Sequence, residues 1–360
     1  MGKRVDLVDV AKGISILLVA FNHSQLSALF QDANNAMGLF RMPLFFFLSG
    51  VFFTTARSPR DFFIHKTDAL LKPYFATLLL LLLTTVLIGR EGVFREALGI
   101  FYGTGFTIRW RPMWFLTHLW LVFMACYFLA RSFRLDGTSA LLRFSLVIGF
   151  ILLGVITMNL FRGAAPTLFD ETPSWVGMPL SVDFMFISMG FFLSGHFLNR
   201  QVKTFTPQFP LLLLTGCIYF LVVFLSDARI DLNTRVYREP VLATLAAVSG
   251  IYLVISGAYY LSRYPGAKAF FKIFGSASLF ILIFHYALGR KMQWFLDQFL
   301  SPDWLLLTAA VSFVFSVTLP LLIKVIVSKN RFLSYFYFPL RHPGHKAEQA
   351  GEPVPYSKIP

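Results

Sequence analysis

The chain has 360 residues, of which 56% are hydrophobic and only 14% charged, and its formal net charge is +14. Soluble domains carry roughly 25% charged residues, so this composition excludes an ordinary soluble protein and favours a bundle of membrane helices. The basic residues lie between the apolar runs rather than in one patch, which argues against a nucleic-acid-binding protein.

Apolar runs follow one another along the chain, separated by charged or Pro- and Gly-rich segments. A bilayer core needs about 20 apolar residues per helix, and these runs approach that length. The sequence therefore predicts an all-α, polytopic integral membrane bundle with about ten transmembrane helices. The expected spans are 10–30, 39–56, 70–89, 113–130, 144–160, 181–199, 210–226, 241–262, 273–289 and 303–327.

The distribution of charge predicts the orientation of these spans. With the N-terminus in the cytoplasm, the inner segments hold 21 of the 32 Lys and Arg residues but only 7 of the 18 Asp and Glu residues. The whole excess of positive charge then lies inside, as the positive-inside rule requires. We therefore expect both termini in the cytoplasm, with residues 1–328 as the transmembrane domain and residues 329–360 as a polar, disordered tail.

The first run carries ionisable side chains, which are costly within a membrane and are therefore functional candidates. Lys12 and His23 are eleven residues apart, close to three helical turns, so they share one helix face about 16 Å apart. Asp9 lies one turn before Lys12 and can neutralise its charge. The structural alternative is a lysine that reaches the inner interface and a hydrogen-bonded histidine within the bundle.

Three further ionisable residues reach the depth of His23 in this topology. Arg41 lies near the outer start of the second span, His118 early in the inward-running fourth, and His285 late in the outward-running ninth. If these residues converge, a neutral imidazole there is suited to take a proton from a hydroxyl nucleophile. An arginine beside it can orient a carbonyl or stabilise developing negative charge. Coincidence is the alternative, because the rotation of each helix is unknown.

A basic cluster lies between the second and third spans, on the cytoplasmic side. Topology determination alone accounts for such residues, whereas the functional alternative is a docking site for a phosphorylated ligand. The sequence contains no P-loop, no H-E-x-x-H and no Cys/His metal spacing, so no metal is expected. The cluster consists of Arg57, Arg60, Lys66 and Lys72.

The pentapeptide FFLSG occurs twice, at Phe46–Gly50 and Phe191–Gly195. Small residues next to aromatic ones favour close helix packing, and we interpret both copies as packing motifs. No internal repeat or inverted duplication accompanies them.

The N-terminal segment VDLVDVAKGISILLVAFNHS resembles the start of the acyltransferase 3 family, also called the fucose 4-O-acetylase-like integral membrane acyltransferases. In that family a basic residue, ten intervening residues and a histidine lie on the first helix. FRMPLFFFLSGVFF resembles the second-helix signature, which places Arg41, Pro43, Ser49 and Gly50 at matching positions. LLKPYF, MWFLTHLW and FGSASLFILIFHYAL resemble weaker family segments in the expected order, so the resemblance spans most of the chain.

This resemblance implies about ten transmembrane helices and transfer of an acyl group, usually acetyl, from cytoplasmic acyl-CoA. The acceptor it implies is a sugar hydroxyl of a surface or periplasmic glycan, and its functional first-helix pair falls on Lys12 and His23. Many members have arginine at the position of Lys12, and lysine cannot make the same bidentate contact.

We therefore expect an inner-membrane O-acyltransferase, embedded in the lipid bilayer, with acyl-CoA as donor and a glycan or lipid-linked sugar as acceptor. A transporter or flippase for a polar lipid or glycan is the alternative, although the inverted repeats of many transporters are not detected. An inactive family member that acts as a membrane scaffold is a third possibility. The catalytic candidates are His23, Lys12 and Arg41, those for substrate contact are Asp9, Trp114, His118 and His285, and those for the CoA phosphates are Arg57, Arg60, Lys66 and Lys72.

Overall fold

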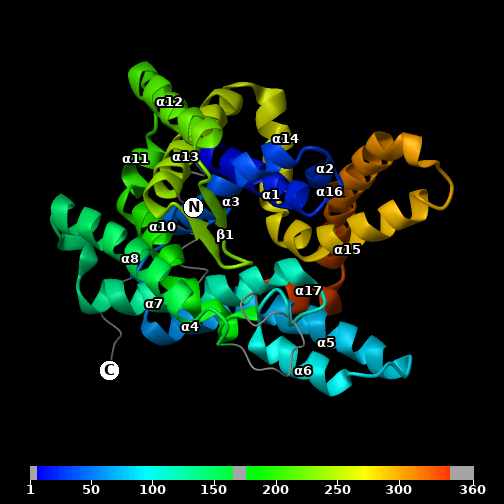
Figure 1. Ribbon diagram of the computed structural model, residues 1–360. Coiled ribbons are helices and arrows are strands. Elements are labelled where there is room, and N and C mark those ends of the chain that lie inside the picture. Colours follow the sequence, from blue (N-terminus) through cyan, green and yellow to red (C-terminus); the bar gives the residue numbers. More distant parts are fainter. Residues whose placement is uncertain (1–5, 165–175, 341–360) are drawn as a thin grey trace.

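The computed structural model describes residues 6–164 and 176–340, and nearly all of this part of the chain is helical (Figure 1). Its one sheet within these residues is a small antiparallel hairpin of β1 (Arg229–Asp231) and β2 (Val236–Arg238). A buried ion pair joins the hairpin turn to the segment before α10: Arg235 Nε lies 2.9 Å from Asp183 Oδ2, and both side chains are 1% exposed.

Each apolar run of the sequence forms a helix. The long helices are α1 (Asp6–Asn22), α3 (Gln31–Val51), α5 (Lys72–Leu87), α7 (Trp114–Ser132), α8 (Ala140–Leu160), α10 (Met185–Phe197), α12 (Phe209–Leu225), α13 (Pro240–Arg263), α14 (Pro265–Ser276), α15 (Ser278–Leu296) and α16 (Leu305–Lys329). Shorter helices lie between or after them: α2 (Leu26–Leu29), α4 (Pro59–Lys66), α6 (Val93–Tyr102), α11 (Asn199–Lys203) and α17 (Arg331–Tyr337).

Six helical segments of the described residues are long and apolar enough to cross a bilayer, or seven if the bent pair α14–α15 is one span. Large apolar side chains face outward on these segments, as on α8, where Leu141 is 76% and Leu160 71% exposed. Such a surface suits lipid rather than water. The expected all-α membrane bundle is therefore confirmed, while the count of ten spans and the cytoplasmic termini stay predictions.

Three of the expected spans fall outside this set for visible reasons. α1 and α12 are 17 residues long, slightly short for a full crossing. α3 has 21 residues, but its first turns carry Gln31, Asp32 and Asn34.

The expected span 273–289 is divided rather than continuous. α14 and α15 meet at Ala277 with a bend of 76°. α14 packs closely along α1, because a Cβ on Gly13 would lie 2.1 Å from the carbonyl oxygen of Phe271. The bend turns α15 away from this contact, toward the C-terminal end of α1 and alongside α16 (Figure 1).

The two FFLSG copies cross each other, α3 against α10. A Cβ on Gly50 would lie 1.9 Å from the carbonyl oxygen of Phe192, and one on Gly195 would lie 2.0 Å from that of Phe47. Each glycine therefore admits the backbone of the other helix, as the packing interpretation expects.

The expected disordered tail begins with structure. Residues 331–337 form α17, whose Tyr337 lies 3.2 Å from Thr77 of α5, hydroxyl to hydroxyl. Lys72 donates a 2.7 Å hydrogen bond to the carbonyl oxygen of Phe338. The remainder of the tail, from residue 341, lies outside the described residues.

Candidate active site

Three cavities lie in series along α1. We name them by the orientation predicted from the sequence. The inner one, of about 310 Å³, is lined by Lys12 and Lys66, and the middle one, of about 30 Å³, by His23 and Trp114. The outer one measures about 570 Å³ and is also lined by His23. Phe45 lines both the inner and the middle cavity, and His23 both the middle and the outer one. Neighbouring cavities therefore share a lining side chain, Phe45 or His23.

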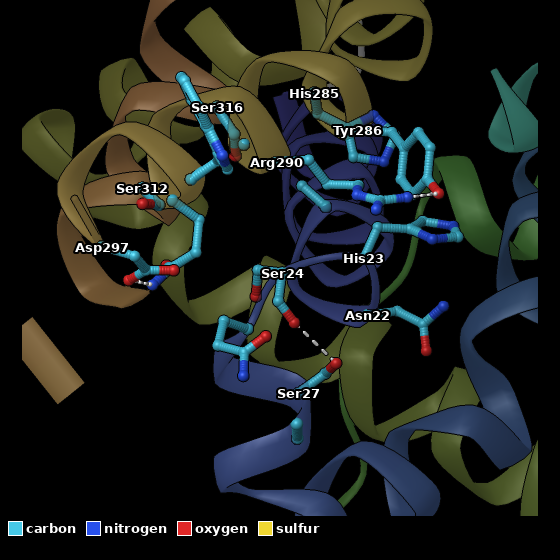
Figure 2. A pocket seen from close by; sticks show the side chains of 16 residues that line it. Asn22, His23, Ser24, Ser27, His285, Tyr286, Arg290, Asp297, Ser312 and Ser316 are labelled. Atoms are coloured by element: carbon cyan, nitrogen blue, oxygen red, sulfur yellow. Dashed lines mark hydrogen bonds between the residues drawn. The ribbon is translucent and has the colours of Figure 1, made fainter. Parts of the chain in front are cut away.

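The outer cavity lies between the end of α1, the segment leading into α2, and the pair α15 and α16 (Figure 2). Its lining is polar, with serine, amide, imidazole and guanidinium groups, and one carboxylate from Asp297. Tyr286 and Trp294 add aromatic surface. Such a mixture suits a hydroxyl-rich organic ligand better than a hydrocarbon.

His23 follows the last residue of α1 and is part of a turn. Its backbone N–H donates to the carbonyl oxygen of Ala20, and Ser24 caps the same end by donating to Phe21. The ring thus projects from the helix end toward α15, where its centroid lies 5.3 Å from that of His285 and 5.7 Å from that of Tyr286. Figure 2 shows these three rings together at the cavity wall.

The protonation of His285 is determined by its own helix. Its Nδ1 lies 2.6 Å from the carbonyl oxygen of Ile281, which can only accept a hydrogen bond, so Nδ1 carries the proton. In the neutral ring, Nε2 then has a free lone pair. This atom is buried, has no hydrogen-bond partner among the described residues, and belongs to a side chain that lines the outer cavity.

Arg41 contacts the site through a neighbour. Its guanidinium donates to Asn22 Oδ1 at 2.7 Å and to Asn34 Oδ1 at 2.9 Å. Asn22 precedes His23 and lines the outer cavity, whereas Arg41 lines none of the three. Arg41 is therefore placed to position the end of α1 rather than to touch a ligand.

The inner cavity is basic and aromatic. The Lys12 ammonium lies 4.3 Å from the ring centroid of Phe52, and that of Lys66 lies 3.6 Å from the ring centroid of Phe123. No carboxylate is among the described side chains that line it. Lys66 ends α4 and is followed by a π-helical turn, Thr67–Leu71, a feature frequent at functional sites. Two ammonium groups in one lining suit an anionic ligand.

Several expected site residues lie apart from the cavities. His118 is fully buried, with Nδ1 3.0 Å from the Leu180 carbonyl oxygen and Nε2 2.8 Å from Ser188 Oγ, so both ring nitrogens are engaged within the protein. Lys72 pairs with Asp68 at 2.5 Å. The residues outside the linings of all three cavities are Asp9, Arg41, Arg57, Arg60, Lys72 and His118.

The sequence reasoning missed most of the outer cavity. Its floor comes from α15, where Gln293 lies two turns after His285, and from α16, where Ser312 and Ser316 lie one turn apart. Paired serines one turn apart within an apolar run are a detectable signal, because they mark a polar stripe on a membrane helix. Trp114 was expected, and it lines the middle cavity beside His23.

The family model for the acyltransferase 3 domain, described as an acyltransferase domain, matches residues 5–325. This range includes every residue that lines the three cavities. No curated protein and no solved structure matches the chain significantly. With most of its length covered by the family model, the chain belongs to the acyltransferase 3 family, and its helices make it a multi-pass membrane protein.

Proposed function

We propose that the protein is an inner-membrane O-acyltransferase that moves an acyl group, acetyl being the expected one, from cytoplasmic acyl-CoA to a hydroxyl of a glycan or lipid-linked sugar. The series of three cavities is the observation that carries this proposal. It runs from two lysines, past Phe45, to His23 and on to a polar outer cavity. A reaction between a cytoplasmic donor and an outer acceptor needs this order of sites.

In this proposal the inner cavity binds the donor, acyl-CoA. Acyl-CoA is an anion whose phosphates suit the ammonium groups of Lys12 and Lys66, and its adenine suits the nearby aromatic rings. Lys12 and His23 are about 16 Å apart along α1, a distance that the extended pantetheine arm can span. Of the four basic residues expected to bind the CoA phosphates, only Lys66 lines this cavity, and Lys12 lines it as well.

His23 is the proposed general base, since its ring lines both the middle and the outer cavity. The imidazole takes the proton of the acceptor hydroxyl, whose oxygen then bonds to the thioester carbonyl carbon. The carbon–sulfur bond breaks, and the imidazolium returns the proton to the departing CoA thiolate. The products are an O-acyl ester and free CoA, so atoms and charge balance.

The test is transfer of labelled acetyl from acetyl-CoA by the purified protein in detergent, with a lipid and glycan extract as acceptor. We expect label in a glycan or lipid, and its loss in His23→Ala without a change in thermal unfolding. His65→Ala, on α4 and outside the three cavities, is the matched control and should retain transfer. Absence of both transfer and CoA binding in a folded preparation would overturn the proposal in favour of the transporter.

A further inference from the structure

Unpaired polar atoms gather at the floor of the outer cavity. His285 Nε2, Gln293 Oε1 and Ser312 Oγ are buried and have no hydrogen-bond partner among the described residues. All three side chains line this one cavity, and those of His285 and Ser312 are 2% and 3% exposed. More than roughly 90% of buried polar groups in proteins are paired with protein or ordered water, so three unpaired atoms at one cavity mark it as a place where a ligand or water supplies the missing partners.

The orientation of the Gln293 amide is fixed by two neighbours. Its Nε2 donates to Asp297 Oδ1 at 2.8 Å and to Thr308 Oγ1 at 3.0 Å. The hydroxyl hydrogen of Thr308 is itself donated to the carbonyl oxygen of Leu305. Both amide hydrogens are thereby used, and Oε1 is left as a pure acceptor. His285 Nε2 is also a pure acceptor, because Nδ1 carries the ring proton.

The hydroxyl hydrogens of three lining serines are likewise already donated within the protein. Ser24 Oγ donates to Phe21, Ser27 Oγ to Ser24 and Ser316 Oγ to Phe313, in each case to a backbone carbonyl. Their oxygens can then only accept from a ligand. These oxygens, together with Gln293 Oε1 and His285 Nε2, are acceptors to which the hydroxyl groups of a ligand can donate.

We infer that the outer cavity is a subsite for the hydroxyl-bearing face of an uncharged polyol, which donates hydrogen bonds to Gln293 Oε1, to His285 Nε2 and to the lining serines. Carboxylate and phosphate oxygens carry no hydrogens and would leave these acceptors unpaired, at a cost. Arg290 and Asp297 both line the cavity, so a charged ligand of either sign meets a like charge there. The inference rests on the proposed function, in which this cavity holds the acceptor, and it names Gln293 and Ser312 as the residues that select it.

The test is binding of the full-length protein in detergent to an array on which each glycan is present as the neutral sugar, as its uronic acid and as its O-methyl ether. We expect the wild type to bind neutral sugars and to lose both the acidic and the methylated forms. Gln293→Leu and Ser312→Ala should each weaken binding by about tenfold, since each removes one buried hydrogen bond.

Two matched controls accompany these variants. Gln298→Leu, just after α15, and Thr318→Ala, on α16, alter exposed residues outside the cavity and should bind like the wild type. Equal or stronger binding of uronic acids overturns the inference, as does wild-type affinity in both cavity variants or no binding of any neutral glycan.

Acetyl-CoA turnover, measured on the same preparations, separates this inference from the proposed function. Selective binding of neutral glycans without any turnover of acetyl-CoA contradicts the acyltransferase and leaves the subsite intact. Acetyl transfer without a preference for neutral glycans contradicts the subsite alone.

Discussion

Arg41 donates a 2.7 Å hydrogen bond to the side-chain oxygen of Asn22, and so ties the second long helix to the residue before His23. Its other terminal nitrogen donates to Asn34 Oδ1, about two turns earlier on the same helix. A planar guanidinium can hold two amides at once in a fixed geometry, which a lysine ammonium does not reproduce. Arg41 therefore determines where the end of α1, and with it the imidazole of His23, is held.

Replacing Arg41 by lysine should lower kcat for acyl transfer by about tenfold, because His23 is then less well positioned. The KM for acyl-CoA should be unchanged, because Arg41 does not line the inner cavity. Asn22→Ala should have a similar effect, and the double variant should be little worse than either single one. Steady-state kinetics of the three variants check this. Fully additive losses would contradict a shared positioning role.

Lys12→Met and Lys66→Met should each raise the KM for acyl-CoA by about tenfold, since each removes one ammonium group from the inner cavity. The control is Arg60→Gln, an exposed position of the basic cluster that lines none of the cavities. Donor titrations at fixed acceptor concentration measure these effects. An increase with Arg60→Gln as large as with Lys66→Met would return the donor site to the cluster expected from the sequence.

Phe45 lines both the inner and the middle cavity, and the centroid of its ring lies 4.7 Å from that of Phe115. Phe45→Leu should widen the space between these cavities and raise the rate with butyryl-CoA relative to acetyl-CoA. Phe128→Leu, at an exposed position of α7, should leave the ratio unchanged. An unaltered ratio in the Phe45 variant would show that acyl length is selected elsewhere.

Gly50→Ala and Gly195→Ala should each destabilise the protein by about 2 kcal/mol, because the added methyl group meets a backbone carbonyl of the opposite helix. Thermal unfolding in detergent provides the measurement. Gly216→Ala, on α12 with open space around it, is the control and should not reduce stability. If both glycine variants unfold at the wild-type temperature, the close approach of α3 and α10 does not contribute to stability as expected.

The sequence was sufficient for the fold class and the family, because both depend on features read along one helix. Apolar runs, their basic flanks and the spacing of Lys12 and His23 are of this kind. The rotation of each helix about its axis cannot be read along one helix, and it determines which candidate residues meet. His118 and His285 were assigned the same depth, yet only His285 lines a cavity with His23, while His118 turns toward Leu180 and Ser188.

The bend at Ala277 and the basic inner cavity escaped prediction for related reasons. The bend accompanies close packing of α14 on α1, a contact between residues more than 250 positions apart. The expected phosphate site was inferred from basic residues that are neighbours in the sequence. Lys12 and Lys66 are far apart in the sequence and line one cavity only because of tertiary packing. The outer cavity likewise depends on tertiary packing, since Gln293 and Ser312 come from two helices and form no motif in the sequence.

The small volume of the middle cavity matters for the membrane as well as for the reaction. A volume of about 30 Å³ leaves room for little more than a water molecule, so a hydrated ion does not fit between the inner and the outer cavity. A membrane under a potential of 100 mV stores about 2.3 kcal/mol for each charge that crosses it, and an open column beside a titratable histidine would dissipate that energy. With Phe45 on one side and His23 on the other, the constriction would let the donor and the acceptor of the proposed reaction meet without opening a path for hydrated ions.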